Sequence, residues 1–357
     1  MRMGFFSFDP VLRVILAVTL AVPLVCLGGP YPQSTIIPSL SFDWSTHRRL
    51  ADDSDNWPIT WADDDHQYTS WGDGPGFGSS RASLGVARIA GSSPETMAGT
   101  NSWTGSGKSY GILSVQGVLY MWVSPGSDGD NYQEARLYRS TDHGSSWTQA
   151  NWAFTKADRL ILPTFLQFGR DYAGAFDSHV YVYANHYQGE TSLRVQKPGE
   201  IALLRVPKTA IMDRSQYEFF GGLDAKGNPL WTSTLSARQP VFTDANGVGW
   251  ATGGVLYNAG LGRYLLITEY NITGEGNLGV FEAPKPWGPW RTVYYGNIGR
   301  ASFYANFSAK WMSQDGRNFV LIFTGVGSDD SWNTLRGSFG SDSDTVAPAS
   351  PKNLQVK

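Results

Sequence analysis

Hydrophobic and polar positions alternate with a period of two along most of the chain after residue 40, which is the pattern of half-buried β-strands. Gly, Asp and Asn bound the alternating runs and favour tight turns between them. Five segments share one form: an apolar strand, a short polar turn and a second, more aromatic strand. They begin near residues 58, 110, 172, 253 and 307 and read PITWADDDHQYTSW, YGILSVQGVLYMWV, YAGAFDSHVYVYAN, GGVLYNAGLGRYLLITEY and FSAKWMSQDGRNFVLIFTG.

The succession of these hairpins predicts the fold. Further strands, such as EARLYRSTD and GNLGVFEAP, follow the hairpins, and only 208–220 is expected to contain a helical turn. Repeated hairpins with outer strands predict an all-β protein, a five-bladed β-propeller over residues 40–340. A jelly roll or a lectin-like sandwich is the competing arrangement.

Composition narrows the function classes. The chain of 357 residues has 41 Gly, 14 Trp, 17 Tyr and 18 Phe but only 17% charged residues, which suits β-sheet with many turns. Flat aromatic faces also stack on sugar rings, although we expect roughly two thirds of the tryptophans to pack in the core. A net charge of −3 provides no field that favours nucleic acid or anionic lipid as a partner.

Both ends of the chain are expected to lie outside the propeller. Arg2 and Arg13 precede VILAVTLAVPLVCLGG, an apolar run too short to span a membrane comfortably. This pattern predicts a cleaved signal peptide over residues 1–30 and an exported protein without a membrane span. Cys26 is the only cysteine, which excludes disulfides and thiolate sites from the mature chain. Residues 341–357 resemble a linker followed by the first strand of a fibronectin type III module.

A short turn motif supports the propeller. Residues 140–147, STDHGSSW, fit S-x-D-x-G-x-x-W, the Asp-box of outer hairpins in sialidase-like propellers. The predicted role is structural: Asp142 caps turn amides, Gly144 takes a positive φ, and Trp147 packs under the hairpin.

The acidic residues of the first hairpin are the main candidates for chemistry. If PITWAD and QYTSWGD are its strands, the acidic run 63–65 forms the turn and points away from the substrate face, on which inner strands begin. The same hairpin places Asp55 and Asp73 opposite each other, with Cβ atoms about 4.5–5.5 Å apart, or about 7–8 Å if the pair is diagonal. Two carboxylates at this range perform glycoside hydrolysis, and their repulsion favours protonation of one of them.

Other roles are open for the same acids. Asp73 can cap the turn in GDG, and Asp52, Asp53 and Asp55 can hold a structural calcium ion. No cofactor or catalytic metal is predicted, because the histidines lack metal-ligand spacing and the mature chain lacks cysteine.

The substrate face gathers polar and aromatic residues that would bond sugar hydroxyls or neutralise a uronate. Lys108 and Arg170 are the favoured contacts. The full set of candidate substrate-binding residues is Asn56, Trp57, Lys108, Gln167, Arg170, Asp171, His186, Trp250, Glu269 and Asn306.

Three stretches together resemble the bacterial secreted family known as domain of unknown function 4185, over roughly residues 40–340: SDNWPITWADDDHQYTSWGDGPGFG, GLGRYLLITEYN with GNLGVFEAPKPWGPWRTVYY, and SAKWMSQDGRNFVLIFTG. The resemblance implies a five-bladed propeller, and some members are endo-D-arabinanases, retaining glycoside hydrolases that act on mycobacterial arabinan. It implies that Asp55 and Gly72-Asp73 match the places of their two catalytic aspartates. A Gly-Asp-Thr-Phe ending in the family is replaced here by GDGPGFG, so fold and site follow from the resemblance more directly than substrate does.

Together these features predict a secreted, monomeric glycoside hydrolase that cleaves an extracellular polysaccharide, arabinan-like by resemblance, with Asp55 and Asp73 as nucleophile and acid/base. A polysaccharide lyase is one alternative, in which Lys108 or Arg170 neutralises a uronate while His186 or a tyrosine removes the C5 proton. A carbohydrate-binding propeller without catalysis is the other.

Overall fold

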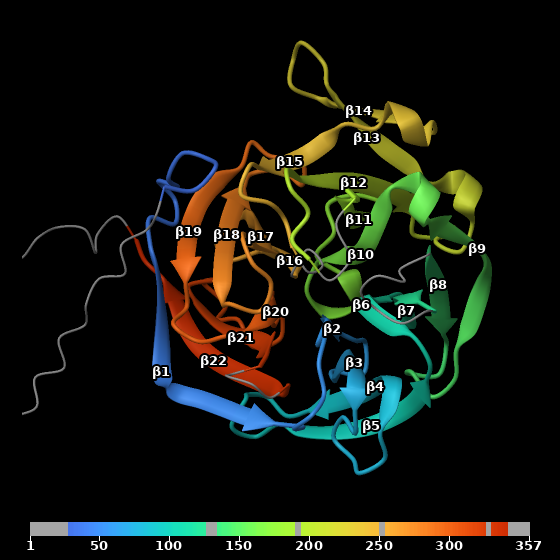
Figure 1. The fold of residues 1–357 in the computed structure, drawn as a ribbon, viewed down its shortest axis with the longest axis vertical. Coiled ribbons are helices and arrows are strands. Elements are labelled where there is room, and N and C mark those ends of the chain that lie inside the picture. Colours follow the sequence, from blue (N-terminus) through green and yellow to red (C-terminus); the bar gives the residue numbers. More distant parts are fainter. Residues whose placement is uncertain (1–27, 126–133, 190–193, 250–253, 326–329, 342–357) are drawn as a thin grey trace, which may run out of the picture.

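The computed structural model describes residues 28–125, 134–189, 194–249, 254–325 and 330–341. Figure 1 shows strands grouped into sheets around a central axis, with the first strand of each group innermost. The predicted all-β five-bladed propeller is confirmed, and the competing sandwich is wrong. Most of the predicted signal peptide with Cys26, the residue Trp250 and the predicted linker from residue 342 onward lie outside the described residues. Within the described ranges, no helix is long and apolar enough to cross a membrane.

Blades 1 and 2 are four-stranded meanders whose strands pair in chain order. Blade 1 consists of β2 (Ile59–Trp61), β3 (Gln67–Gly74), β4 (Ala82–Ala90) and β5 (Ala98–Gly105). Blade 2 consists of β6 (Lys108–Val115), β7 (Val118–Ser124), β8 (Glu134–Ser140) and β9 (Thr148–Thr155). Trp61 pairs with Gln67, so the first hairpin is centred on residue 64, as the sequence predicts.

Blade 3 begins earlier than the sequence predicts. Its inner strand is β10 (Leu160–Gln167), whereas the expected hairpin started near residue 172. All positions of β10 are buried, and Pro163 lies where the register with the next strand shifts. Continuous burial and an internal proline both hide such a strand from a search for alternation. The remaining strands are β11 (His179–His186), β12 (Gly199–Pro207), β13 (Glu218–Leu223), β14 (Pro229–Thr232) and β15 (Pro240–Asp244).

Blades 4 and 5 complete the ring. Blade 4 consists of β16 (Val255–Asn258), β17 (Arg263–Glu269), β18 (Asn277–Ala283) and β19 (Arg291–Asn297). Blade 5 consists of β20 (Phe303–Phe307), β21 (Asn318–Thr324), β22 (Trp332–Phe339) and β1 (Leu40–Leu50). β1 pairs with β22 along its length, so strands from the two ends of the domain share one blade (Figure 1). This pairing closes the ring and ties its first segment to its last.

The blades share one polarity, which defines two faces. We call the face on which the inner strands begin the front face, and the opposite face, which carries the turns after the inner strands, the back face. On the front face, the backbone N–H of Asn56 donates to Thr324 Oγ1 at 3.1 Å, joining the residues before β2 to the end of β21. On the back face, Lys310 Nζ lies 3.2 Å from Asp65 Oδ2, and this ion pair joins the turns of blades 5 and 1.

Much of the core lies between neighbouring blades. Trp57, Trp71, Trp122 and Trp332 are among the largest fully buried side chains. Trp57 and Trp332 meet edge to face between blades 1 and 5, with ring centroids 5.3 Å apart. A buried aromatic removes about 150–250 Å² from water, so these contacts hold blade against blade.

The turn between β8 and β9 makes the contacts predicted for its acidic residue. Asp142 accepts hydrogen bonds from Ser146 N at 2.9 Å and from Ser140 Oγ at 2.7 Å. Gly144 has φ +79°, and the Trp147 indole N–H donates to its carbonyl at 3.3 Å. The hydrogen bonds, chiefly those from Ser146 and Ser140, lower the pKa of Asp142 to about 2. Asp142 therefore stabilises its own turn, and the sialidase-type Asp-box assignment stays a prediction.

Candidate active site

Asp55 lies at the front end of blade 1, just before β2. Its backbone forms an antiparallel bridge with Gly72 at the end of β3, with N–H···O distances of 3.0 and 2.8 Å. Continuing the register of Ile59↔Thr69 would pair Asp55 with Asp73, so the observed pairing is shifted by one residue. A Cβ atom at position 72 would collide with the Asp55 carboxylate. Glycine at this position therefore leaves the space that the Asp55 side chain occupies.

Lys108, at the start of β6, joins the two predicted catalytic aspartates. Its ammonium forms an ion pair with the Asp73 carboxylate. The same ammonium lies 3.3 Å from the point that a Cβ atom would take at position 72, a point that the Asp55 carboxylate also borders. Asp55 is 6% exposed, whereas the Asp73 side chain is 48% exposed. One buried cation therefore adjoins a buried and an accessible carboxylate, and it offsets the mutual repulsion predicted from two carboxylates alone.

The acids of the alternative calcium site beside Asp55 have arginine partners instead of sharing one point. Asp52 pairs with Arg49 at 3.1 Å, and Asp53 pairs with Arg81 at 3.2 Å. In the part of the chain that the structure describes, one group of acidic and histidine side chains has its ligand atoms close enough to share an ion, and that group excludes Asp55. The acids before β2 therefore diverge rather than converge.

Three of the predicted substrate contacts belong to the scaffold around Asp55. Trp57 is fully buried, and its indole N–H donates to Ser331 O at 3.1 Å. Asn306 is also buried and donates through Nδ2 to Trp57 O at 3.3 Å. Asn56 is 1% exposed and donates through Nδ2 to Asp55 Oδ1 at 2.9 Å. These positions correct the prediction, because Trp57 and Asn306 pack the blades together and Asn56 orients Asp55.

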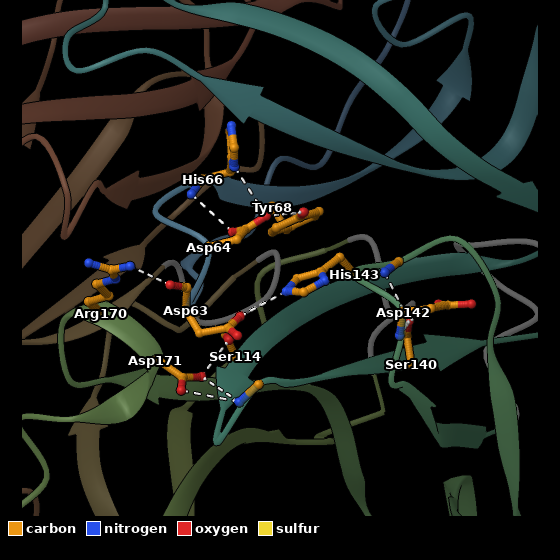
Figure 2. A network of polar contacts seen from close by, with 12 residues as sticks. Asp63, Asp64, His66, Tyr68, Ser114, Ser140, Asp142, His143, Arg170 and Asp171 are labelled. Atoms are coloured by element: carbon orange, nitrogen blue, oxygen red, sulfur yellow. Dashed lines mark hydrogen bonds and ion pairs between the residues drawn. The ribbon is translucent and has the colours of Figure 1, made fainter.

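Gln167, Arg170 and Asp171 do not lie on the front face, which corrects a second group of predictions. Because blade 3 begins at residue 160, these residues end or follow its inner strand and approach the back face. Gln167 Oε1 accepts a hydrogen bond from Thr60 Oγ1 at 2.8 Å, linking the inner strands of blades 3 and 1. Arg170 donates to the Asp63 carbonyl (Figure 2). Asp171 accepts hydrogen bonds from the Ser114 hydroxyl near the end of β6 and from the Gly117 N–H in the turn that follows.

The acidic run 63–65 forms the turn between β2 and β3 on the back face, as predicted. Figure 2 shows Asp63 directed to His143, at 2.9 Å, and Asp64 directed to Tyr68, at 2.8 Å. Burial opposes ionisation of Asp64, but hydrogen bonds from His66 and Tyr68 lower its pKa. Ligand atoms of Asp63, Asp64 and His143 lie within 4.8 Å of one another, which is the one grouping among the described residues that could hold a metal ion. Each of these side chains already has a protein partner.

Glu269 ends β17 on the front face and is buried. The Gly274 N–H donates to its Oε1 at 2.6 Å, while Oε2 has no partner among the described residues. Burial raises the pKa of Glu269 to about 8, so this carboxyl is mainly protonated at neutral pH. It borders a cavity of about 20 Å³ between blades 4 and 5, which is large enough for about one water molecule.

His186 ends β11 on the front face, where the sequence places it. Its Nδ1 lies 2.5 Å from Glu200 Oε2, and both residues line a cleft with Arg238. Sequence reasoning missed Glu200 and Arg238. Glu200 stands alone in the apolar strand KPGEIALLRV, and Arg238 reaches the cleft only because the chain returns to blade 3 after β14. Trp250, the remaining predicted contact, is outside the described residues.

Residues 110–324 match the model of the domain of unknown function DUF4185. The chain belongs to the DUF4185 family. The matched residues run from the start of blade 2 to the end of β21, and blade 1 with Asp55 and Asp73 precedes them. The family resemblance found in the sequence is thus confirmed. No curated protein matches this DUF4185 chain in sequence.

Solved structures of low sequence identity share the fold. A protein of Bacteroides ovatus ATCC 8483 that carries a hydrolase assignment has a TM-score of 0.52 and 12% identity, over 84% of this chain and 90% of its own. The GH43_1 enzyme of Xanthomonas citri has a TM-score of 0.50 and 12% identity, over 82% of this chain and 89% of its own. At such identities the likeness shows the fold alone.

Proposed function

We propose that this DUF4185 protein is a glycoside hydrolase that cleaves an extracellular polysaccharide, with Asp55 and Asp73 as its carboxylate pair. One observation carries the proposal: the two acids meet at the front face around Gly72 and Lys108. The fold shared with the GH43_1 enzyme supports the same reaction class.

The environments of the two aspartates suit a pair with fixed geometry. Asn56 holds one oxygen of Asp55, and Lys108 holds one oxygen of Asp73. Asp73 is the member that a substrate can touch, because half of its side chain is exposed. A closely spaced pair supplies a nucleophile and an acid/base, and a wider pair admits the attacking water.

Arabinan-like polymers are the proposed substrates. The family resemblance implies that Asp55 and Asp73 match the places of the two catalytic aspartates of arabinanases. The Xanthomonas citri enzyme has also been crystallised with xylose, which, like arabinose, is a pentose. Both lines support a polymer of five-carbon sugars.

The lyase alternative is weakened at the two cations predicted for it. Arg170 donates to a back-face carbonyl, and the Lys108 ammonium pairs with Asp73. Neither cation is therefore placed to neutralise a uronate beside a general base on the front face.

Product analysis tests the proposal directly. The purified protein is incubated with arabinan, xylan and a polyuronate, and reducing ends and ultraviolet absorbance are followed. Hydrolysis predicts new reducing ends from a pentose polymer without added absorbance. Reducing ends accompanied by the absorbance of an unsaturated uronide would establish elimination instead. Retention on a polysaccharide without any cleavage would identify a binding propeller and overturn the proposal.

A further inference from the structure

A second concave site lies on the front face at blade 3. It is a cleft of about 490 Å³ whose polar walls include Asp158, Arg159, His186, Glu200 and Arg238. Arg159 directly precedes β10, and His186 ends β11, so both belong to the face that carries Asp55. Of the substrate contacts predicted from the sequence, His186 is the one that lines this cleft.

Two arginines lie close together in the cleft, and among the described residues neither forms an ion pair with a carboxylate. Arg238 donates to Leu235 O at 2.9 Å and to Asp158 O at 3.0 Å. Arg159 donates through Nε and Nη2 to Tyr187 O at 3.1 and 2.9 Å. Burial, with a smaller effect of the Arg159 charge, lowers the pKa of Arg238. Neutral carbonyls therefore fix two guanidinium groups and leave further N–H groups available to a ligand.

Acceptors stand beside these donors. Glu200 Oε2 is 2.5 Å from His186 Nδ1, which leaves Glu200 Oε1 and His186 Nε2 without a partner among the described residues. Gln239 adds an amide side chain to the same wall. Sugar hydroxyls both donate and accept, so they match a cleft that offers both kinds of group. An anionic ligand fits less well, because Glu200 and Asp158 carry negative charge beside the arginines.

We infer that this cleft is a distal subsite for a neutral sugar unit of the same glycan that reaches Asp55 and Asp73. The inference rests on the proposed function and deepens it: the substrate is a polymer of neutral sugars that extends across the front face from blade 1 to blade 3. The cleft gives affinity that grows with chain length, and the aspartates perform the cleavage.

The test compares Arg238→Ala with Arg139→Ala, an exposed arginine of β8 outside the cleft. Gln239→Ala provides a second cleft variant, in case Arg238→Ala unfolds, because the Gln239 side chain has no hydrogen-bond partner among the described residues. Thermal unfolding first checks that each variant is folded. Native electrophoresis through gels containing arabinan, xylan, galactan or glucomannan then reports binding, and initial rates on the polymer and on its shortest cleaved oligosaccharide report KM and kcat.

We expect Arg238→Ala to weaken retardation and raise KM for the polymer about tenfold, at unchanged kcat, because one charge-assisted hydrogen bond is lost. Gln239→Ala should have a smaller effect of the same kind, and Arg139→Ala none. KM for the shortest oligosaccharide should not change. Equal retardation of wild type and both cleft variants, or equal KM changes on polymer and short oligosaccharide, would overturn the subsite. Retardation that depends on Arg238 in a protein that cleaves nothing would keep the subsite and refute the hydrolase.

Discussion

The two faces of the propeller use their acidic residues in opposite ways. On the front face, Asp55 and Asp73 come from the two ends of one hairpin, yet they adjoin a single ammonium group, that of Lys108. On the back face, Asp63 and Asp64 are consecutive, yet each is directed to a different partner (Figure 2). The neighbouring acids of the turn each bond a separate partner, whereas the acids at the two ends of the hairpin adjoin one shared cation.

The contrast between the faces indicates where a reaction can occur. A reaction centre needs charged groups that meet at a point open to a substrate, and the accessible Asp73 beside the buried Asp55 meets that need. Of the back-face acids, Asp64 accepts local hydrogen bonds within the hairpin, and Asp63 bonds His143 of blade 2. Density of acids in the sequence is therefore a poorer guide than their convergence in space.

The largest effect on turnover is expected from the front-face changes Asp55→Asn and Asp73→Asn. Each change should lower kcat at least about 1,000-fold, because an amide neither attacks an anomeric carbon nor exchanges a proton. KM should change by no more than a few fold, because an amide is nearly isosteric with a carboxylate. Initial rates on the polysaccharide that wild type cleaves give both constants. Retention of wild-type kcat by either variant would remove that residue from the catalytic pair.

Glu269→Gln should produce the largest change in stability, and the change should depend on pH. In the folded protein the pKa of Glu269 is about 8 against an ordinary value of 4.5, so the unfolded chain loses this proton first as pH rises. Wild-type stability should therefore fall between pH 4.5 and 8, whereas the variant does not titrate. The variant should be more stable than wild type by about 4 kcal/mol at pH 8 and similar to it near pH 4. Urea unfolding at both pH values measures this, and a difference that is constant with pH would contradict it.

Asp142→Ala should lower the free energy of unfolding by about 1–2 kcal/mol at neutral pH, through lost hydrogen bonds in the turn after β8. The pKa of Asp142 lies below its ordinary value, so its contribution is present above about pH 4 and is lost as pH falls toward 2. The difference in free energy of unfolding between variant and wild type, measured by denaturant unfolding, should become smaller over that pH range. Activity measured well below the melting temperature should persist, and a folded but inactive variant would contradict the structural role.

The smallest effect is expected from Asp64→Asn, the back-face counterpart of Asp55→Asn. The amide oxygen can keep the hydrogen bond from the His66 N–H, and the amide NH2 group can donate to the Tyr68 hydroxyl in place of the second carboxylate oxygen, so stability should fall by less than about 1 kcal/mol. Turnover should equal that of wild type. A dead Asp64→Asn beside active Asp55→Asn would reverse the assignment of the two faces.

The centre of the first hairpin could be read from sequence because a polar, acidic turn is flanked by alternating strands of matched length. That centre put Asp55 opposite position 73 to within one residue, and the observed partner is Gly72. The remaining shift could not be predicted, because it depends on the fit of the Asp55 carboxylate against Gly72 and Lys108. These contacts join residues far apart in the chain.

The inner strand of blade 3 could not be predicted from the sequence. This strand is buried along its whole length and contains Pro163, so alternation does not reveal it. Because the hairpin of blade 3 was predicted to start too late in the chain, Arg170 and Asp171 were assigned to the wrong face. The burial of Trp57 was equally hidden, since an indole beside an acidic residue can either stack on a sugar or pack against Trp332.

Local sequence patterns were enough to predict the all-β class, the repeated hairpins, the turn chemistry around Asp142 and the separation of the acidic run 63–65 from Asp55. All of these follow from local periodicity and turn preference, which act over a few residues. Three features required the folded structure: the ion pair of Lys108 with Asp73, the burial of Glu269 with its raised pKa, and the cleft that Arg238 shares with His186. These facts depend on which blades become neighbours when the ring closes, because burial and the distances between charges are set by contacts that no local pattern encodes.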